Sequence, residues 1–111
     1  MEWIPLTSEA QLPDIIARSE EKAQVIFKHS TRCSISSVAM QRLKRGGLPG
    51  EIDFYYLDLI TYRGLSNKVA DLFGVTHESP QILIIRNGSC VYDESHLSIT
   101  VDDIIESVGT P

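Results

Sequence analysis

The stretch from residue 23 to residue 43 most constrains what this chain can fold into, because a strand pattern there gives way to a helix pattern. Residues 23–28 are mostly apolar and predict a short buried strand. Beyond them the stem of Arg42 can flank an apolar stripe at helical spacing, which consists of Ile35, Val38, Ala39 and Leu43. Cys33 lies at the junction and therefore falls in the first turn of the predicted helix.

A cysteine at the start of a helix is favoured as a thiolate. Unpaired backbone N–H groups and the positive end of the helix dipole lie there, and they lower a thiol pKa from its ordinary value of roughly 8.5. Arg32 adds a neighbouring positive charge. The other neighbours, Thr31, Ser34 and Ser36, are polar, which argues against a cysteine buried as a small hydrophobic residue. We therefore expect Cys33 to be a reactive nucleophile and a thiolate at neutral pH.

Ser36 makes the motif Cys-x-x-Ser. A serine cannot close a local disulfide, so a thiol from outside must resolve any covalent intermediate on Cys33. Two interpretations of Ser36 stay open: it is a polar helix residue, or its hydroxyl donates to the thiolate one turn away. Cys90 lies in an alternating strand pattern, and we expect it to pack in the core rather than to act as a resolving cysteine. The two cysteines and three histidines do not match a zinc-ligand spacing, so no metal is predicted.

Length and composition narrow the classes of protein. The 111 residues fit one domain, residues 1–111, and contain no run of the roughly 18 apolar residues that a membrane helix needs. A net charge of −5 argues against nucleic-acid binding, which relies on basic patches. The first residues lack a secretory signal, so we expect the protein in the cytoplasm, a reducing compartment where a reactive thiol plus a structural one is more common than a disulfide.

The first half of the chain predicts an edge strand at residues 3–6 and a helix that runs to about Glu21. Ser8 and Gln11 form a capping box for that helix. Because Pro13 is accepted only near a helix start, the helix begins nearer Leu12, or its first turn is locally adjusted. The helix after Cys33 stops at the glycine-rich residues 46–50.

The second half predicts an interior strand at 52–59, parallel to strand 23–28. A helix follows, with its apolar stripe at Leu65, Val69, Leu72 and Phe73 and a cap at Gly74. Strands 81–86 and 89–92 form an antiparallel hairpin around Asn87-Gly88. Thr100 caps a last helix, whose apolar face is Val101, Ile104, Ile105 and Val108. The predicted order is β-α-β-α-β-α-β-β-α.

That order, with a cysteine at the start of the helix after the second strand and a proline just before the hairpin, resembles the thioredoxin fold. Three stretches, 28–36, 77–81 and 95–100, together resemble the monothiol bacilliredoxins, the YtxJ-type proteins of the bacillithiol system. The resemblance covers essentially the whole chain. Ser34 is a departure, because the family often has proline there; this can shift the thiol pKa without changing the reaction class.

The resemblance implies an α/β fold with a central mixed sheet of four to five strands and four flanking helices. It implies a thiol–disulfide oxidoreductase in which Cys33 takes bacillithiol from S-bacillithiolated client proteins, with bacillithiol as co-substrate and no other cofactor. It also implies a cis Ser79–Pro80 bond beside the cysteine. The expected catalytic residues are Cys33 and Ser36, and the expected substrate-binding residues are Thr31, Arg32, Ser34, Ser79 and Pro80.

Other charged residues and histidines have less definite roles. Arg32 and Lys28 are either plain surface charges or attract the carboxylates of bacillithiol. His77 and His96 lie in the family-like stretches and are expected to be structural or to support the site indirectly, and His29 has no assigned role.

Three alternatives to the bacilliredoxin hypothesis stay open. The protein could be a glutaredoxin-like thiol transferase for another small thiol. It could be an iron–sulfur cluster carrier, in which Cys33 of two chains and two small thiols hold the cluster. It could also be a thioredoxin-like adaptor with an inert thiol. The sequence leaves client proteins, the reductant and the oligomeric state open, with a monomer as the default.

Overall fold

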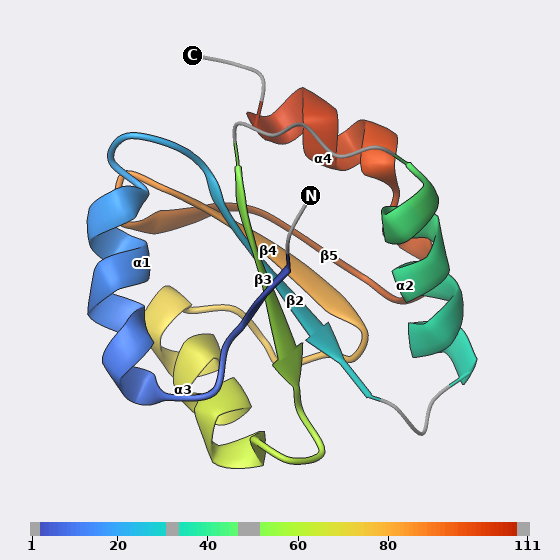
Figure 1. Cartoon of the computed structure of the whole chain (residues 1–111), viewed down its shortest axis with the longest axis horizontal. Helices are drawn as coiled ribbons and strands as arrows, with labels where there is room; N and C mark the ends of the chain where they lie inside the picture. The colour runs from blue at the N-terminus through green and yellow to red at the C-terminus, as the bar shows by residue number, and fades with distance from the viewer. Residues whose placement is uncertain (1–2, 31–33, 47–51, 109–111) are drawn as a thin grey trace.

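A computed structural model describes residues 3–30, 34–46 and 52–108. Within these residues a five-stranded mixed sheet has two helices on each face (Figure 1). The strands are β1 (Trp3–Pro5), β2 (Gln24–His29), β3 (Asp53–Asp58), β4 (Gln81–Arg86) and β5 (Ser89–Ser95). The helices are α1 (Leu12–Arg18), α2 (Ser34–Arg45), α3 (Arg63–Phe73) and α4 (Val101–Val108), with 3-10 turns at Glu9–Gln11 and His96–Ser98.

The strand order is β1-β3-β2-β4-β5. β3 pairs in parallel with both β1 and β2, whereas β4 is antiparallel to β2 and to β5. The predicted parallel pair, the predicted hairpin and the order of elements are therefore confirmed. β1 lies at an edge of the sheet, where Pro5 removes no hydrogen bond from an interior ladder.

The sheet divides the core into two halves. Residues such as Val25 and Phe27 on β2 pack toward α2 and α4, whereas Ile26 between them packs toward α1 and α3. In Figure 1 the first pair of helices lies to the right of the sheet and the second pair to the left. Because both faces of the central strands are covered, their sequences read as nearly continuous apolar runs. No helix in the described part of the chain is long and apolar enough to cross a bilayer.

Local capping signals set the ends of α1. The Ser8 hydroxyl accepts a hydrogen bond from the Ala10 N–H at 3.2 Å, and the Gln11 side chain accepts one from the Ser8 N–H at 3.1 Å, which confirms the capping box. A 3-10 turn precedes α1, and Pro13 lies in the first turn of the helix. The α-helix ends at Arg18, earlier than the predicted Glu21.

Ser19 explains why α1 ends early. Its hydroxyl donates to the carbonyl of Ile16 at 2.6 Å and accepts the Gly88 N–H at 2.9 Å. Its carbonyl accepts the Asn87 N–H at 2.9 Å. Both Asn87 and Gly88 have positive φ, 52° and 79°, as the predicted two-residue hairpin turn requires. The end of α1 is therefore tied to the tip of the hairpin.

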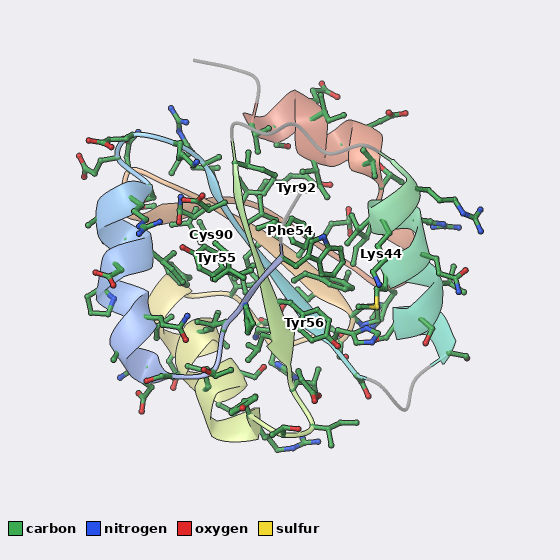
Figure 2. The ribbon with its side chains drawn as sticks, in the orientation of Figure 1. Lys44, Phe54, Tyr55, Tyr56, Cys90 and Tyr92 are labelled. Atoms are coloured by element: carbon green, nitrogen blue, oxygen red, sulfur yellow. The ribbon has the colours of Figure 1, made fainter. Side chains whose placement is uncertain are left out.

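The hairpin carries a bulge that sequence alternation did not predict. Ile84 pairs with Tyr92 and Ile85 pairs with Cys90, so Val91 is an extra residue on β5. Cys90 consequently packs with the α1 and α3 half of the core, and Tyr92 with the α2 and α4 half (Figure 2). β5 continues to Ser95, beyond the predicted end at Tyr92.

Three predicted apolar stripes are partly wrong. On α4, Ile105 is exposed (40%), while Ile104 is buried. On α2, Ile35 and Val38 are exposed (39% and 43%), while the buried positions are Ser36, Ala39 and Leu43. On α3, Leu72 is exposed, while Ser66 is buried beside Leu65 and Val69. In α2 and α3 a buried serine makes a polar contact with another segment, and this contact rotates the buried face away from the outermost apolar residues. The caps at Gly74, in the left-handed conformation, and at Thr100, whose hydroxyl accepts the Asp103 N–H, are confirmed.

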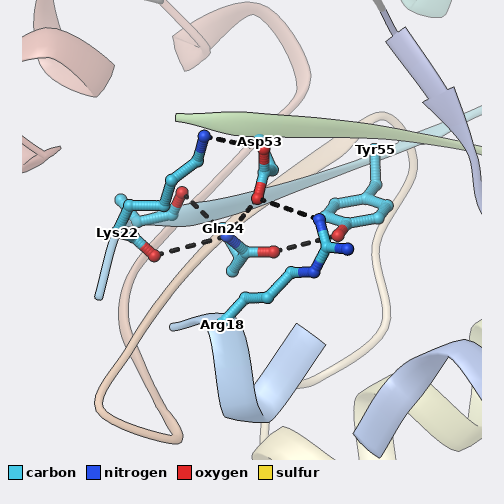
Figure 3. Close-up of polar contacts among 6 residues, drawn as sticks. Arg18, Lys22, Gln24, Asp53 and Tyr55 are labelled. Atoms are coloured by element: carbon cyan, nitrogen blue, oxygen red, sulfur yellow. Dashed lines mark hydrogen bonds and ion pairs between the residues drawn. The ribbon is translucent and has the colours of Figure 1, made fainter. Parts of the chain in front are cut away.

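A polar cluster closes one end of the sheet (Figure 3). Asp53 accepts a hydrogen bond from Gln24 Nε2 at 2.8 Å and pairs with Lys22 Nζ at 3.0 Å, and Arg18 lies 3.8 Å away. The Tyr55 hydroxyl donates to Gln24 Oε1 at 2.9 Å. Burial raises the pKa of Asp53, but the hydrogen bonds and the two cations outweigh it, so its pKa lies below the ordinary value. The cluster fixes the entry into β2 and β3.

Gly46 provides a test of the packing between α2 and α4. A Cβ at this position would lie 2.7 Å from Val101 Cβ and closer still to one of its methyl groups. We expect Gly46→Ala to lower the free energy of unfolding by about 1–3 kcal/mol, because a β-branched side chain on a helix cannot move aside. Urea unfolding measures this.

Gly64→Ala in α3 is the matched control, since no atom lies within 4 Å of its added Cβ. It should be neutral or should stabilise the protein by up to about 1 kcal/mol. Adding Val101→Ala to Gly46→Ala should restore part of the loss. Equal urea midpoints for Gly46→Ala and the wild type would contradict the close contact.

Candidate active site

The predicted site residues come from segments that meet at one end of the central strands. In the strand register Lys28 of β2 lies between Leu57 of β3 and Gln81 of β4. The end of β2, the start of α2 and the loop before β4 therefore lie together at this end of the sheet. Ser36, Ser79 and Pro80 are described there, and Ser34 begins α2. Thr31, Arg32 and Cys33 lie outside the described residues.

Ser36 joins the first turn of α2 to the end of β2. Its side chain is fully buried, and its hydroxyl oxygen accepts the Ser30 N–H at 3.2 Å. This contact gives Ser36 a structural role, because it holds the chain on both sides of Cys33 in a fixed relation. Donation of the hydroxyl to the Cys33 thiolate stays a prediction.

The Ser79–Pro80 bond is cis, as predicted. The Pro80 carbonyl accepts the His96 N–H at 2.9 Å, and Gln81 Nε2 donates to the Thr76 carbonyl at 2.9 Å, so the loop is bonded at both sides. The Ser79 hydroxyl is buried and has no hydrogen-bond partner within residues 3–30, 34–46 and 52–108. Substrate binding by Ser79 and Pro80 stays a prediction.

His96 has the structural role that was expected of it. Its Nε2 lies 3.3 Å from Glu78 Oε2, with both side chains about half exposed. This pair and the backbone bond to Pro80 join the end of β5 to the loop that carries the cis bond. His96 itself has a positive φ of 58°, which turns the chain from β5 toward α4.

Lys28 is not a surface charge, contrary to one of the two interpretations of the sequence. Its side chain is fully buried, and its Nζ donates to the Ser66 carbonyl at 3.1 Å and lies 3.2 Å from His77 Nδ1. Burial lowers the pKa of Lys28 from 10.5 to about 8. A buried lysine also cannot take up bacillithiol carboxylates from the surface. The sequence analysis missed this burial, although Lys28 alternates with Gln24 and Ile26 on an interior strand, which is the sequence signal for it.

His77 is the partner of Lys28. Burial lowers the pKa of His77, and the positive charges of Lys28 and Arg63 lower it further, while Glu78 opposes them. His77 is therefore neutral at pH 7. Since an ammonium has only donors, Nδ1 is the acceptor and the ring proton lies on Nε2. Ser66 Oγ lies 3.3 Å from the same Nδ1.

His29 occupies the opposite face of β2, beneath the first turn of α2. Its ring is almost fully buried, and its centroid lies 5.6 Å from that of Phe27 and 5.5 Å from that of Tyr56. Burial lowers the pKa of His29, and this effect exceeds the opposing effects of Asp58 and the Ser36 backbone. A neutral imidazole is therefore part of the support under α2.

Cys90 lies away from this end of the sheet. It pairs with Ile85, at the other end of β4 from Pro80, and its Sγ donates to the Tyr92 carbonyl at 3.3 Å. The thiol is free, and burial raises its pKa. These facts favour the packing interpretation of Cys90. In the described part of the chain no three His, Cys, Asp or Glu side chains lie close enough to hold a metal ion.

Comparison with solved structures identifies the fold of this chain. The chain has a TM-score of 0.77 and 32% identity to a protein described as a candidate oxidoreductase with a thioredoxin fold, covering 94% of this chain and 91% of that one. A mutant thioredoxin from Halobacterium salinarum NRC-1 gives a TM-score of 0.74 at 17% identity over 99% and 93% of the two chains. Spinach chloroplast thioredoxin f gives 0.72 at 15% identity over 97% and 91%. The protein has the thioredoxin fold.

The sequence defines the family within that class. Residues 4–104 match the family described as monothiol bacilliredoxin BrxC. The protein belongs to this family, and its fold and family together make it a thiol oxidoreductase. The resemblance inferred from three short stretches is thereby confirmed.

The lowered pKa of Lys28 leads to a prediction about how the free energy of unfolding depends on pH. The folded-state pKa of Lys28 is about 8 against 10.5 without burial, so the unfolded chain holds this proton more tightly. Burial of the charged ammonium therefore lowers the free energy of unfolding. The full loss applies below pH 8, and it disappears as the pH rises from 8 to 10.5. The free energy of unfolding of Lys28→Met minus that of the wild type should therefore fall by about 3 kcal/mol between pH 7 and pH 10.5.

Urea unfolding at each pH measures the difference between the two proteins, so that other titrating groups cancel. Lys68→Met removes an exposed lysine from α3 and should show no such trend. A pH-independent difference between Lys28→Met and wild type would contradict the depressed pKa.

Proposed function

We propose that this protein removes bacillithiol from S-bacillithiolated proteins by a monothiol mechanism with Cys33 as the nucleophile. The observation that carries the proposal is the match of residues 4–104 to the monothiol bacilliredoxins. The co-substrate is bacillithiol, with no other cofactor, and the partners are bacillithiolated client proteins. The protein acts as a monomer in the reducing cytoplasm.

The cycle consists of two thiol–disulfide exchanges. The Cys33 thiolate attacks the bacillithiol sulfur of the client mixed disulfide, the S–S bond breaks, and the client cysteine leaves as a thiolate that takes up a proton. A disulfide between Cys33 and bacillithiol results. A second bacillithiol thiolate then attacks the bacillithiol sulfur of that disulfide, which releases Cys33 as a thiolate and forms bacillithiol disulfide. Each cycle consumes one free bacillithiol, returns the client cysteine to its thiol and moves the S–S bond from the client mixed disulfide to bacillithiol disulfide.

Ser36 and Cys90 support the monothiol character of this cycle. Ser36 stands where a dithiol enzyme has a second cysteine, and its buried hydroxyl already bonds to Ser30. Cys90 packs on the α1 and α3 side of the sheet, with a raised pKa and a bond to Tyr92. Neither residue offers a thiolate that could expel bacillithiol from Cys33, so release depends on an external thiol.

The loop at Pro80 supports the choice of substrate-binding residues. It lies at the same end of the sheet as the start of α2 and carries the buried, unpaired Ser79 hydroxyl described above. In the proposed complex the backbone at Ser79 pairs with the client segment around its modified cysteine. Thr31, Arg32 and Ser34 flank the nucleophile, and Arg32 attracts the carboxylates of bacillithiol.

Intact-mass measurement during turnover tests the mechanism. With a bacillithiolated client, one bacillithiol should accumulate on Cys33 and disappear when further bacillithiol is added. Cys33→Ser should be inactive, and Cys90→Ser should keep most of the activity. Ser36→Cys should shorten the life of the adduct, because a neighbouring thiol attacks at a high effective concentration.

Ser37→Cys is a control for Ser36→Cys, because Ser37 is an exposed residue on the next position of α2. It should leave the life of the adduct close to that in the wild type. A Cys33–Cys90 disulfide during turnover, or loss of release in Cys90→Ser, would replace the monothiol mechanism with a dithiol cycle.

A further inference from the structure

The loop before β4 has a histidine contact on each of its two sides. On the inner side, His77 Nδ1 lies 3.2 Å from the buried Nζ of Lys28 and 3.3 Å from Ser66 Oγ. On the outer side, Glu78 Oε2 lies 3.3 Å from His96 Nε2, directly after the end of β5. His77 and Glu78 are neighbours in the chain, so the two contacts act on the same short segment.

The inner contact requires a neutral His77 ring. An ammonium group has only donors, so Lys28 bonds to His77 only while Nδ1 is unprotonated. Protonation of the ring would place two positive charges 3.2 Å apart at a partly buried site, where water screens them less than at the surface. The contribution of this contact to stability is therefore present above the ordinary histidine pKa of 6.5, and it is lost as the pH falls through the lower pKa of folded His77.

The outer contact has the opposite dependence on pH. His96 forms an ion pair with the Glu78 carboxylate only when its ring is protonated. With a neutral ring the contact is at most a hydrogen bond between a neutral group and a carboxylate. Both side chains are about half exposed, so the pair is weak, but it gains strength as the ring takes up a proton.

We propose that the loop before β4 changes its anchor with pH: His77 holds it to Lys28 and α3 when both histidines are neutral, and His96 holds it to the end of β5 when both are protonated. The loop carries Ser79 and Pro80, so the change alters the freedom of the segment that is proposed to bind the client. Neither contact involves the thiol, so the inference does not depend on the proposed function.

The charged groups around His77 agree with the inner half of this device. Lys28 on β2 and Arg63 on α3 are the cations that act on the ring, and both oppose its protonation. Glu78, beside it in the chain, favours protonation but is outweighed. The pKa of Lys28 of about 8 keeps the ammonium charged over the whole range in which a histidine titrates.

The charged groups around His96 differ from those around His77. The turn His96–Ser98 packs against α2, whose charged side chains lie in its last turn and are Arg42, Lys44 and Arg45. On β5 the nearest carboxylate along the chain is that of Glu94, whose Oε1 accepts the Ser95 N–H at 3.0 Å. Glu78 is therefore the charged group in direct contact with the His96 ring.

Amide hydrogen exchange at pH 7 and pH 5, measured by NMR and corrected for the intrinsic effect of pH, tests the device. Two amides flank the loop: the Val75 N–H bonds to the Ala70 carbonyl at 3.0 Å, and the His96 N–H bonds to the Pro80 carbonyl at 2.9 Å. In the wild type the protection factor at Val75 should fall by about threefold or more from pH 7 to pH 5, whereas that at His96 should hold or rise. The amide of Ile26 in β2 reports global unfolding and is the reference.

Two variants separate the two anchors. His77→Asn keeps a neutral acceptor near the position of Nδ1 but cannot be protonated, so it should abolish the fall in protection at Val75. Glu78→Gln keeps the length of the side chain and removes its charge. It should lower the protection at His96 by about twofold at pH 5 and leave it unchanged at pH 7. Glu20→Gln, which removes an exposed carboxylate after α1, is the control and should change neither amide.

The wild-type measurement decides the question if His77→Asn does not fold. Protection at Val75 that is equal at pH 7 and pH 5, or that falls equally in His77→Asn, would overturn the inference. A loss at His96 in Glu78→Gln of the same size at both pH values would also overturn it, because the contact would then be independent of protonation. A parallel fall at Ile26 and Val75 would show global unfolding in place of a local change of anchor, and would overturn it as well.

Discussion

The active-site end of this thioredoxin fold depends on a buried ammonium group. Lys28 Nζ joins the end of β2 to the first turns of α3 and, through His77, to the loop before β4. Hydrophobic burial holds the sheet and helices together but does not fix where a loop of polar residues lies. The two bonds to Lys28 do so, and burial of the ammonium lowers its pKa to about 8.

The two faces of the sheet have different roles. Ser36, the cis Ser79–Pro80 bond and the buried His29 lie at the end of the sheet where β2 finishes. Cys90 lies farther along the hairpin, and burial raises its pKa. The bulge at Val91 turns Cys90 toward α1 and α3 while Tyr92 turns toward α2 and α4. One face of the sheet thus supports the helix that follows Cys33, and the second cysteine is kept in the core of the other face.

Local interactions were predictable from the sequence, and tertiary polar contacts were not. The hairpin turn, the capping box at Ser8 and the cap at Thr100 depend on residues at most four positions apart. The cis bond followed from the family resemblance. The partner of Lys28 is 49 residues away, so a charged residue at the end of an apolar strand gave no sign of it. The buried face of α2 was misjudged because the Ser30–Ser36 contact, rather than apolar periodicity alone, sets its rotation. Cys33 and the two residues before it, Thr31 and Arg32, lie outside the described part of the chain.

The choice of small thiol is the central claim, and a competition between two mixed disulfides tests it most directly. One client protein with a single reactive cysteine is modified either with bacillithiol or with glutathione, and each form is incubated with the reduced protein and its own free thiol. The proposed function predicts that the client is released from bacillithiol at least about tenfold faster, which corresponds to roughly 1.4 kcal/mol of discrimination. Equal rates, or faster release from glutathione, would contradict it and would indicate a thiol transferase of broader range.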